Sequence, residues 1–410
     1  MTSDVADRIR RFRRSWHAGD LWPDVAEPAF LAAMTEIARV TTVLAGAPSG
    51  RAALPSGADR PALRAATFIS GMGPLLGFWA EHGRLDAPPD VAALLARHLE
   101  HGRHRAQRLR ARLEAVLGAL RAERVTPTIL KGMHTAWVYF PEPGTRTMAD
   151  LDLLIDEADL PAARRALAAA GLSPVSTVRG RSTWRPPGDH VLLSLEVTQA
   201  DDPWELDLHR SLDRWFADIV PARLGVVGPG DAVSLEPGPV GARGLAQPLL
   251  TALLALHVSD HFETTALVRL VELAWVMQRD LKSGTLPWGV LLDRLRATGA
   301  SAFVYPAFEL TEKLVPGTVD AEFRAAIRAD APAAVRRAVD RVEPAGAMRM
   351  FDRSLDTRFI WLNGWRSRLA WVGWRLWPHV GDVPASLSRA AGITANRFWR
   401  VITGRMRWAR

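Results

Sequence analysis

Two aspartates one residue apart stand out in the stretch TMADLDLLID, residues 147–156. In a strand, residues two apart point to the same face, so Asp150 and Asp152 should project together while Leu151 and Leu153 point into a core. Carboxylates held this close repel each other, and a buried pair must take up a proton or a cation. The spacing therefore predicts that Asp150 and Asp152 bind a divalent cation, Mg²⁺ or Mn²⁺, since both ions accept oxygen ligands.

A third carboxylate is available on a later segment. The stretch WELDLH, residues 204–209, has strand alternation and places Asp207 and Glu205 on one face. Carboxylates from two neighbouring strands would suit a two-metal site, with Asp207 as the third ligand and Glu205 as the alternative. A D-x-D pair is equally typical of a solvent-exposed edge strand, so the metal interpretation depends on the surrounding segments.

Phosphate chemistry is indicated by the segment just upstream, ILKGMHTAWVYF at residues 129–140. It has the character of a strand, a Lys-Gly turn and a short helix, so the N–H groups of Gly132 and of the helix N-terminus could bind phosphate oxygens. Lys131 lies on this turn and is one of three lysines in the chain, and Arg146 in the following loop could reach a triphosphate. The alternative for Lys131 is a solvated turn lysine.

The elements that must position these residues change character along the chain. Apolar residues recur at helical spacing before residue 125, and short strands and helices alternate after it. A Gly/Pro-rich segment at 224–244 is interpreted as a linker, after which helical spacing resumes to about residue 345. The predicted fold class is α+β, with a small mixed β-sheet and helix predominating. The predicted regions are an N-terminal helical region at 1–124, an α/β core at 125–235, a C-terminal helical domain at 236–345 and an Arg/Trp-rich tail at 346–410.

Within the core, the pattern predicts short strands and one longer helix. The helix is ADLPAARRALAAAG, closed by Gly171. The predicted strands are TPTIL at 126–130, DLDLLID at 150–156, HVLLSLEV at 190–197 and WELDLHRSL at 204–212.

Composition excludes some classes of site. The chain has 410 residues, of which 48% are hydrophobic and 23% charged, and it contains no cysteine, so disulfides and thiolate metal sites are excluded. Arginines occupy the N-terminal segment where a signal peptide would need an apolar run, so we expect a cytoplasmic protein. Residues 361–410 hold nine arginines and one acid, Asp382, which accounts for the whole net charge of +8. The protein therefore has a basic tail rather than a basic surface throughout.

The order of these features resembles the uncharacterised bacterial nucleotidyltransferase family of the DNA-polymerase-β-like superfamily. The shared pattern is a glycine-containing turn in LKG, then PGTR and ADLDLLID, and finally a third carboxylate in ELDLH. The helical segments MGPLLGFWAEHGRL and LLALHVSDHFETTALVRLVELAWV are similar as well, so the resemblance covers roughly residues 65–280. The turn is usually Gly-Ser in the superfamily and Lys131-Gly132 here, so the role of a serine hydroxyl does not carry over.

The resemblance implies a palm-like nucleotidyltransferase core and transfer of a nucleoside monophosphate from an NTP to an acceptor, with release of pyrophosphate. Asp150 and Asp152 would hold the metal that binds the triphosphate, and Asp207 would bind a second metal near the acceptor hydroxyl. No protein nucleophile is then required. A small molecule, a peptide, another protein or RNA would suit as acceptor. The alternative function is a non-catalytic binding or scaffold protein that keeps the fold and associates with a partner or a membrane surface through its basic tail.

Histidines near these segments allow other interpretations. His257 and His261 are four residues apart, which is metal-ligand spacing on a helix, but the glutamate of a zincin is missing, and a helical pair lining the acceptor or base pocket is the preferred interpretation. His209 shares a face with the third carboxylate and is interpreted as a half-buried strand histidine or as a residue that orients that carboxylate. Arg269 and Glu272 are interpreted as an intrahelical pair.

The basic tail contains an aromatic stripe at helical spacing. The arginines within this segment make a transmembrane helix unfavourable. Residues 356–410 could instead make a peripheral contact with a membrane surface, or the tryptophans could pack over the helical domain, which is the commoner outcome for such stripes. The predicted stripe comprises Trp361, Trp365, Leu369, Val372 and Leu376.

Overall fold

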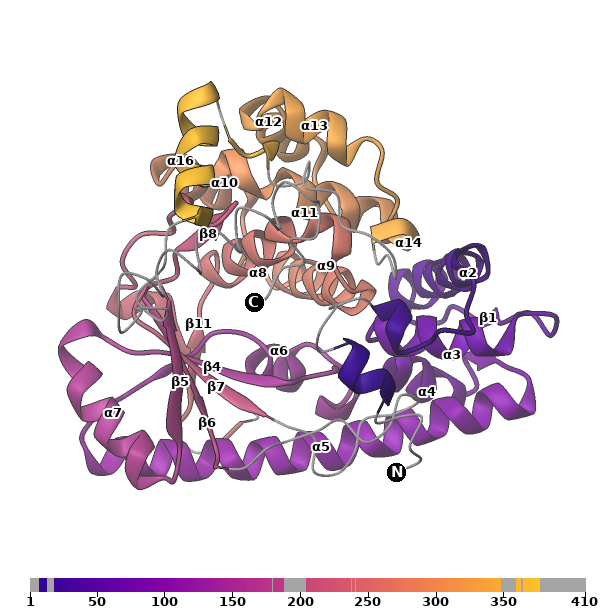
Figure 1. Cartoon of the computed structure of the whole chain (residues 1–410), viewed down its shortest axis with the longest axis horizontal. Coiled ribbons are helices and arrows are strands. Elements are labelled where there is room, and N and C mark those ends of the chain that lie inside the picture. The colour runs from indigo at the N-terminus through magenta and orange to yellow at the C-terminus, as the bar shows by residue number, and fades with distance from the viewer. Residues whose placement is uncertain are drawn as a thin grey trace.

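The computed structural model describes residues 7–12, 18–178, 180–187, 204–236, 238–239, 241–347, 359–362 and 364–376. Helix makes up 58% of the structure and a mixed sheet of seven strands lies among the helices, so the predicted α+β class is confirmed. In Figure 1 the long helix α5 (Pro89–Ala122) runs beneath the sheet, and helices of the C-terminal half lie above it.

The central sheet has the strand order β10-β11-β3-β4-β7-β6-β5. Strand β4 runs antiparallel to β3 and parallel to β7, and the register sets Asp152 beside Asp207. Strand β6 is antiparallel to β7 on its other side, with Thr183 beside Asp207. The strands are β3 (Thr128–Ile129), β4 (Asp150–Leu154), β5 (Ser173–Val178), β6 (Arg181–Arg185), β7 (Glu205–His209), β10 (Ala232–Ser234) and β11 (Arg243–Leu245).

Alternation in β4 separates the two faces of the sheet. Leu151 and Leu153 are 2% and 0% exposed and belong to a core cluster shared with α5 and with α7 (Leu160–Ala169). The two aspartates of DLDLL lie on the opposite face, where both contact the same lysine side chain. Helices α8 (Leu249–Asp260) and α9 (Leu267–Lys282) lie on that side (Figure 1). Helix α6 (Met133–Val138) packs Met133, Ala136 and Trp137 into the core cluster.

Helix α5 is 34 residues long because apolar residues recur every three or four positions from Val91 to Leu120. Its C-terminal half packs under the sheet through Leu109 and Leu113, and its N-terminal half packs on α4 (Gly73–Glu81). One rigid element therefore supports both the sheet and the N-terminal helices.

Helix α2 (Glu27–Gly46) is, among the described residues, the helix that is long and apolar enough to cross a membrane by length and composition, with a mean hydropathy of 1.3. Core helices of globular proteins meet the same criterion. In this structure Phe30, Met34 and Ile37 are fully buried, and α2 packs against α3 (Arg60–Ile69) and contacts α9.

The segment after the sheet is helical, in agreement with its apolar spacing. Helix α11 (Ser301–Leu314) packs on both α8 and α9 and continues their apolar core. Four other helices lie between α9 and residue 347, namely α10 (Trp288–Ala297), α12 (Ala321–Asp330), α13 (Ala333–Val339) and α14 (Pro344–Ala347).

The aromatic stripe predicted for the tail is divided in the structure. Trp361 is 4% exposed and packs in the helical core, whereas Trp365 and Leu369 are 66% and 59% exposed. The prediction of one continuous stripe is wrong, because helix α16 (Gly364–Leu376) begins at a glycine with φ 77°, so Trp361 is not on the same helix. Residues 377–410 lie outside the described part of the chain.

The Gly/Pro-rich segment at 224–244 contains β10 and the start of β11, which corrects its interpretation as a linker. Strand β11 pairs in parallel with β3. A Cβ atom on Gly244 would lie 2.7 Å from Nδ1 of His134 and 2.6 Å from the Leu235 side chain, so glycine is needed for the close approach of β11 to α6. The sheet thus continues past residue 235, while the predicted domain boundaries stay a prediction.

Hairpin β5–β6 lies outside the predicted strands. Every residue of β5 is exposed, so this edge strand lacks the apolar alternation that predicts a strand. The strand predicted at 190–197 lies outside the described residues. The predicted strands around β3, β4 and β7, the turn into α6 and helix α7 with its closing Gly171 are present.

Candidate active site

The parallel pairing of β4 with β7 brings two acidic residues together on one face of the sheet. Asp152 and Asp207 are direct neighbours in the register and each is 3% exposed. His209 lies two residues after Asp207, so its side chain shares this face. One ligand atom from each of these three side chains lies within 4.8 Å of the others, which is close enough for one metal ion to bind all three.

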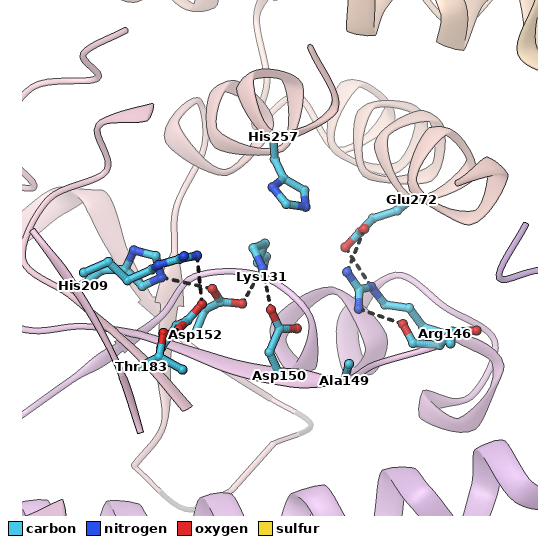
Figure 2. Close-up of polar contacts among 12 residues, drawn as sticks. Lys131, Arg146, Ala149, Asp150, Asp152, Thr183, His209, His257 and Glu272 are labelled. Atoms are coloured by element: carbon cyan, nitrogen blue, oxygen red, sulfur yellow. Dashed lines mark hydrogen bonds and ion pairs between the residues drawn. The ribbon is translucent and has the colours of Figure 1, made fainter. Parts of the chain in front are cut away.

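Asp150 occupies the outer edge of this arrangement. Its side chain is 35% exposed, against 2% for Asp152, and it is not part of the three-residue cluster. Figure 2 shows Asp150 and Asp152 next to each other, both directed toward Lys131. The structure therefore confirms that the two aspartates share a face, and places Asp152 deep in the site and Asp150 at its edge.

Lys131 connects the two aspartates. Its Nζ atom lies 2.5 Å from Oδ2 of Asp152 and 3.5 Å from Oδ2 of Asp150, and its side chain is 10% exposed. The next residue, Gly132, has φ 63° and ψ −97°, a conformation that L side chains rarely adopt and that starts α6 directly after the lysine. Lys131 is therefore a buried partner of the acidic pair and not a solvated turn lysine.

Asp207 is held by two residues of β6. Thr183 Oγ1 donates a hydrogen bond of 2.6 Å to Oδ1 of Asp207, and Arg181 Nη1 donates one of 3.1 Å to Oδ2. Burial raises the pKa of Asp207 above its ordinary value, the negative charge of Asp152 adds to the rise, and Arg181 opposes it. The carboxylate is thus oriented by fixed donors on a neighbouring strand.

Asp152 has the opposite shift. Burial by itself would raise its pKa, but the positive charge of Lys131 and the hydrogen bond with Nε2 of His209, 3.0 Å from Oδ1, outweigh burial and hold the pKa of Asp152 below its ordinary value. Asp152 is therefore the carboxylate that stays ionised. Its two oxygens contact Lys131 and His209, and a metal ion would either replace these partners or bind beside them.

Arg146 is engaged by a glutamate from α9. Its Nε and Nη2 atoms donate hydrogen bonds of 2.9 Å each to the two carboxylate oxygens of Glu272, and Thr135 Oγ1 of α6 also donates to this carboxylate. The two side chains of the ion pair are 10% and 4% exposed. Glu272 was predicted to pair within its helix with Arg269, but the structure connects it to the loop before β4 (Figure 2).

Helix α8 contributes a histidine above the carboxylates. Figure 2 shows His257 directed from α8 toward Lys131. The side chain of Arg214 contacts Nδ1 of His257, and burial together with the charges of Arg269, Arg214 and Lys131 lowers the pKa of His257 well below its ordinary value. The imidazole of His257 is therefore neutral and lies beside the cationic side chain of Arg214.

His257 and His261 do not form the predicted helical pair. Helix α8 ends at Asp260, and His261 has φ −128° and contacts Asp260 with its Nε2 atom at 3.3 Å. The four-residue spacing therefore does not put both rings on one helix face, because the helix ends between them.

Glu205, the alternative third ligand, has a different partner. Its carboxylate accepts hydrogen bonds of 2.9 Å and 2.7 Å from Arg185 of β6 and its side chain is 33% exposed. Asp207, in contrast, lies in the cluster with Asp152 and His209. The geometry thus favours Asp207 over Glu205 as the inner carboxylate, although the roles of both residues stay predictions.

The contributions of β6 and α9 were not found from the sequence. The stretch RSTWR does carry a signal, since Arg181, Thr183 and Arg185 are two residues apart and therefore share one face. The partnership of Arg146 and Glu272 has no such signal, because 126 residues separate them.

Residues 72–316 match a family described as uncharacterised nucleotidyltransferases, and this match covers more than half of the chain. The chain belongs to this family. The match includes every residue of the acidic cluster together with Lys131, Arg146 and Glu272, whereas α2, α3 and the tail lie outside it. No curated protein and no solved structure matches the sequence. The resemblance to a nucleotidyltransferase family is thus confirmed, and the group of Asp152, Asp207 and His209 is one that could bind a metal ion.

Proposed function

We propose that this nucleotidyltransferase transfers a nucleoside monophosphate from an NTP to an acceptor and releases pyrophosphate. The observation that supports this best is the meeting of Asp152 and Asp207 from adjacent parallel strands, with Asp150 at the open edge and Lys131 between the aspartates. Family membership makes an NTP the expected first substrate.

The donor set suits a divalent cation. Three carboxylates on one sheet face would hold Mg²⁺ or Mn²⁺, with Asp150 and Asp152 on the triphosphate side and Asp207 on the acceptor side. A bound divalent ion would neutralise charge on the triphosphate and make a coordinated hydroxyl more acidic. The deeper burial of Asp152 and Asp207 would keep water away from the reacting atoms.

The protein groups then have positional roles. An oxygen of the acceptor forms a bond to the α-phosphorus, the bond from this phosphorus to the bridging oxygen breaks, and pyrophosphate leaves with that electron pair. Asp207, fixed by Thr183 and Arg181, would orient the acceptor hydroxyl and accept its hydrogen bond as the proton leaves. No side-chain nucleophile takes part in this scheme.

Phosphate binding by Lys131, Gly132 and Arg146 is part of the proposal. Lys131 reaches the space between Asp150 and Asp152, so a metal ion that takes over these carboxylates would release its ammonium group toward the phosphates. Arg146 is already paired with Glu272, so a phosphate contact would use its remaining N–H groups or replace this partner.

The acceptor is proposed only as a class: a small molecule, a peptide, a protein or RNA. We also propose a cytoplasmic location with a peripheral contact to anionic membrane lipid. The support for this contact is the exposure of Trp365 and Leu369 on α16 in a tail that is rich in arginine. The non-catalytic alternative has no such support in the site, since all three carboxylates of the predicted set are present.

The test is metal-dependent nucleotide binding by the wild type and by Asp152→Asn, measured by calorimetry with each NTP and with Mg²⁺ or Mn²⁺. The wild type should bind an NTP more tightly when metal is present, and Asp152→Asn should lose this dependence because its amide cannot balance the charge of the ion. Equal affinity with and without metal in the wild type would refute the proposal.

A further inference from the structure

We infer that His209 is a metal ligand and that, together with Asp152 and Asp207, it forms a mixed nitrogen and oxygen site that selects Mn²⁺ over Mg²⁺. The inference deepens the proposed function by naming the ion and a ligand outside the three carboxylates. It rests on that function only for the use of the ion, because binding of the ion can be measured without any nucleotide.

The position of His209 supports this role. It is the last residue of β7, in register with Leu154 on one side and Arg181 on the other, and its side chain is 12% exposed. The Nε2 atom lies 3.0 Å from Oδ1 of Asp152, so the ring is directed at the buried carboxylate and not toward solvent. One atom of this ring belongs to the group of ligand atoms that lie within 4.8 Å of each other.

The two cationic side chains next to the aspartates, Lys131 and Arg181, do not contact the oxygen of Asp152 that faces His209. Lys131 contacts Oδ2 of Asp152, and Arg181 contacts Oδ2 of Asp207, so each of these cations lies at one oxygen of its carboxylate. His209 approaches the other oxygen of Asp152, Oδ1. A cation on the His209 side would therefore meet two carboxylates and an imidazole without displacing Lys131.

The chemistry of the donors decides between the two ions. Mg²⁺ is held by oxygen ligands and water and binds imidazole poorly, whereas Mn²⁺, the first member of the series of divalent transition metals, accepts an imidazole nitrogen beside carboxylates more readily than Mg²⁺ does. With His209 as a ligand in place of an oxygen donor, the site of Asp152, Asp207 and His209 favours Mn²⁺. Asp150, at the edge, offers oxygen ligands and suits either ion.

A purely structural role makes a different prediction. If His209 only donates a hydrogen bond to Asp152, its nitrogen never touches the ion. Pulsed electron paramagnetic resonance separates the two cases, because a directly bound imidazole nitrogen modulates the echo of Mn²⁺. The experiment uses the full chain with Mn²⁺ alone, and the variant His209→Asn, which keeps a hydrogen-bond donor but has no imidazole.

We expect nitrogen modulation in the wild type and its loss in His209→Asn, with Mn²⁺ affinity lowered by about 10- to 100-fold and Mg²⁺ affinity changed much less. The control His261→Asn, on a residue that contacts Asp260 outside the cluster, should keep the modulation. Absence of modulation in the wild type overturns the inference without any variant, and so does modulation that persists in a folded His209→Asn protein.

The outcomes also separate this inference from the proposed function. A wild type that shows nitrogen modulation but transfers no nucleotide supports the metal site and overturns the transferase proposal. A wild type that transfers nucleotide with Mg²⁺ as efficiently as with Mn²⁺ and shows no nitrogen modulation supports the transferase and overturns the role of His209.

Discussion

Arg146 and Glu272 form a two-pronged ion pair that joins the loop before β4 to helix α9. The two bonds, Nε to Oε1 and Nη2 to Oε2, are each 2.9 Å, and the hydroxyl of Thr135 on α6 donates to the same carboxylate. Helix α6 and the loop before β4, which are close in the sequence, therefore meet the distant helix α9 at one carboxylate. Figure 2 shows Arg146 directed at Glu272. This contact fixes the helices above the sheet relative to the acidic cluster.

The first prediction concerns the stability of this contact. Arg146→Met should lower the free energy of unfolding by about 3–5 kcal/mol, because it leaves the carboxylate of Glu272 buried without its guanidinium partner. The double variant Arg146→Met with Glu272→Leu should recover most of this loss, because no buried charge remains. Urea unfolding of the wild type, both single variants and the double variant gives the coupling between the two sites.

The same variants test phosphate binding. If Arg146 binds the triphosphate, the stable double variant should still bind NTP more weakly than the wild type. If its affinity for NTP is unchanged, Arg146 is a structural residue only. Arg165→Met is the matched control, since Arg165 also pairs with a glutamate but its side chain is 64% exposed.

The second prediction concerns Lys131. In Lys131→Met the positive charge beside Asp150 and Asp152 is gone and no longer repels a bound cation. Binding of Mn²⁺ without nucleotide should therefore become tighter, by about 10-fold or more if this repulsion is worth about 1.5–3 kcal/mol. Affinity for the metal–NTP complex should fall, because the phosphates lose a cation. Calorimetry with metal alone and with metal and NTP measures both quantities.

Lys282→Met, at the exposed end of α9, is the control for the loss of one positive charge. Metal affinity that falls in Lys131→Met, or that changes equally in both variants, would contradict a charge repulsion between Lys131 and the metal ion.

The acidic core of the site was predictable because its signal is local. The two-residue spacing of Asp150 and Asp152 sets their common face, and the same spacing in ELDLH identifies Asp207. The turn at Gly132 and the class of fold follow from periodicity and glycine placement in the same way. These features depend on a few neighbouring residues, so they can be predicted from a single sequence.

The remaining parts depend on contacts between distant segments. Arg181 and Thr183 become site residues only because β6 pairs with β7, and β6 follows an exposed edge strand with no apolar alternation. Strand β11 was not predicted because its glycine is typical of a turn. In the structure Gly244 is needed because the ring of His134 packs against it, and not because the chain turns there. The ring of His209 reaches Asp152 across a parallel pair, which no spacing within either strand indicates.

The third prediction separates the two candidates for the third carboxylate. Asp207→Ala should lower turnover by at least about 100-fold while NTP affinity changes little, because this group acts on the acceptor during transfer. Glu205→Ala should do much less, since its carboxylate is held by Arg185 and is partly exposed. The assay follows label from α-labelled NTPs into any new species in a cell extract, together with release of pyrophosphate. Full activity of Asp207→Ala with loss in Glu205→Ala would reverse the assignment.

The fourth prediction is a pH dependence of stability that comes from His134. This residue is 2% exposed, and burial lowers its pKa from 6.5 to about 4. Because the unfolded chain takes up a proton below about pH 6.5 and the folded protein does not, stability is present above this pH and is lost as the pH falls toward 4, by about 3 kcal/mol.

His134→Gln should therefore lose less stability than the wild type between pH 7.5 and pH 4.5, as measured by urea unfolding at the two pH values. His104→Gln is the control on an exposed residue of α5, whose side chain is 61% exposed. Parallel curves for the wild type and His134→Gln would show that another group causes the loss.

The fifth prediction concerns the exposed face of α16. Trp365 and Leu369 are 66% and 59% exposed, and Arg366 lies with its guanidinium 5.5 Å from the ring centre of Trp365, so apolar and cationic groups share one surface. Such a surface suits the interface of an anionic membrane, where the rings enter the headgroup region and the arginines meet lipid phosphates. The protein should sediment with anionic vesicles at low salt and less at high salt, because the attraction is screened.

Trp365→Ser with Leu369→Ser should weaken this binding by at least about 10-fold, since each buried side chain is worth about 1.5–3 kcal/mol. Val290→Ser, at an apolar position on α10 that is 51% exposed, is the control. Vesicle binding that is absent, or that is unchanged in the double variant, would exclude this face as the contact.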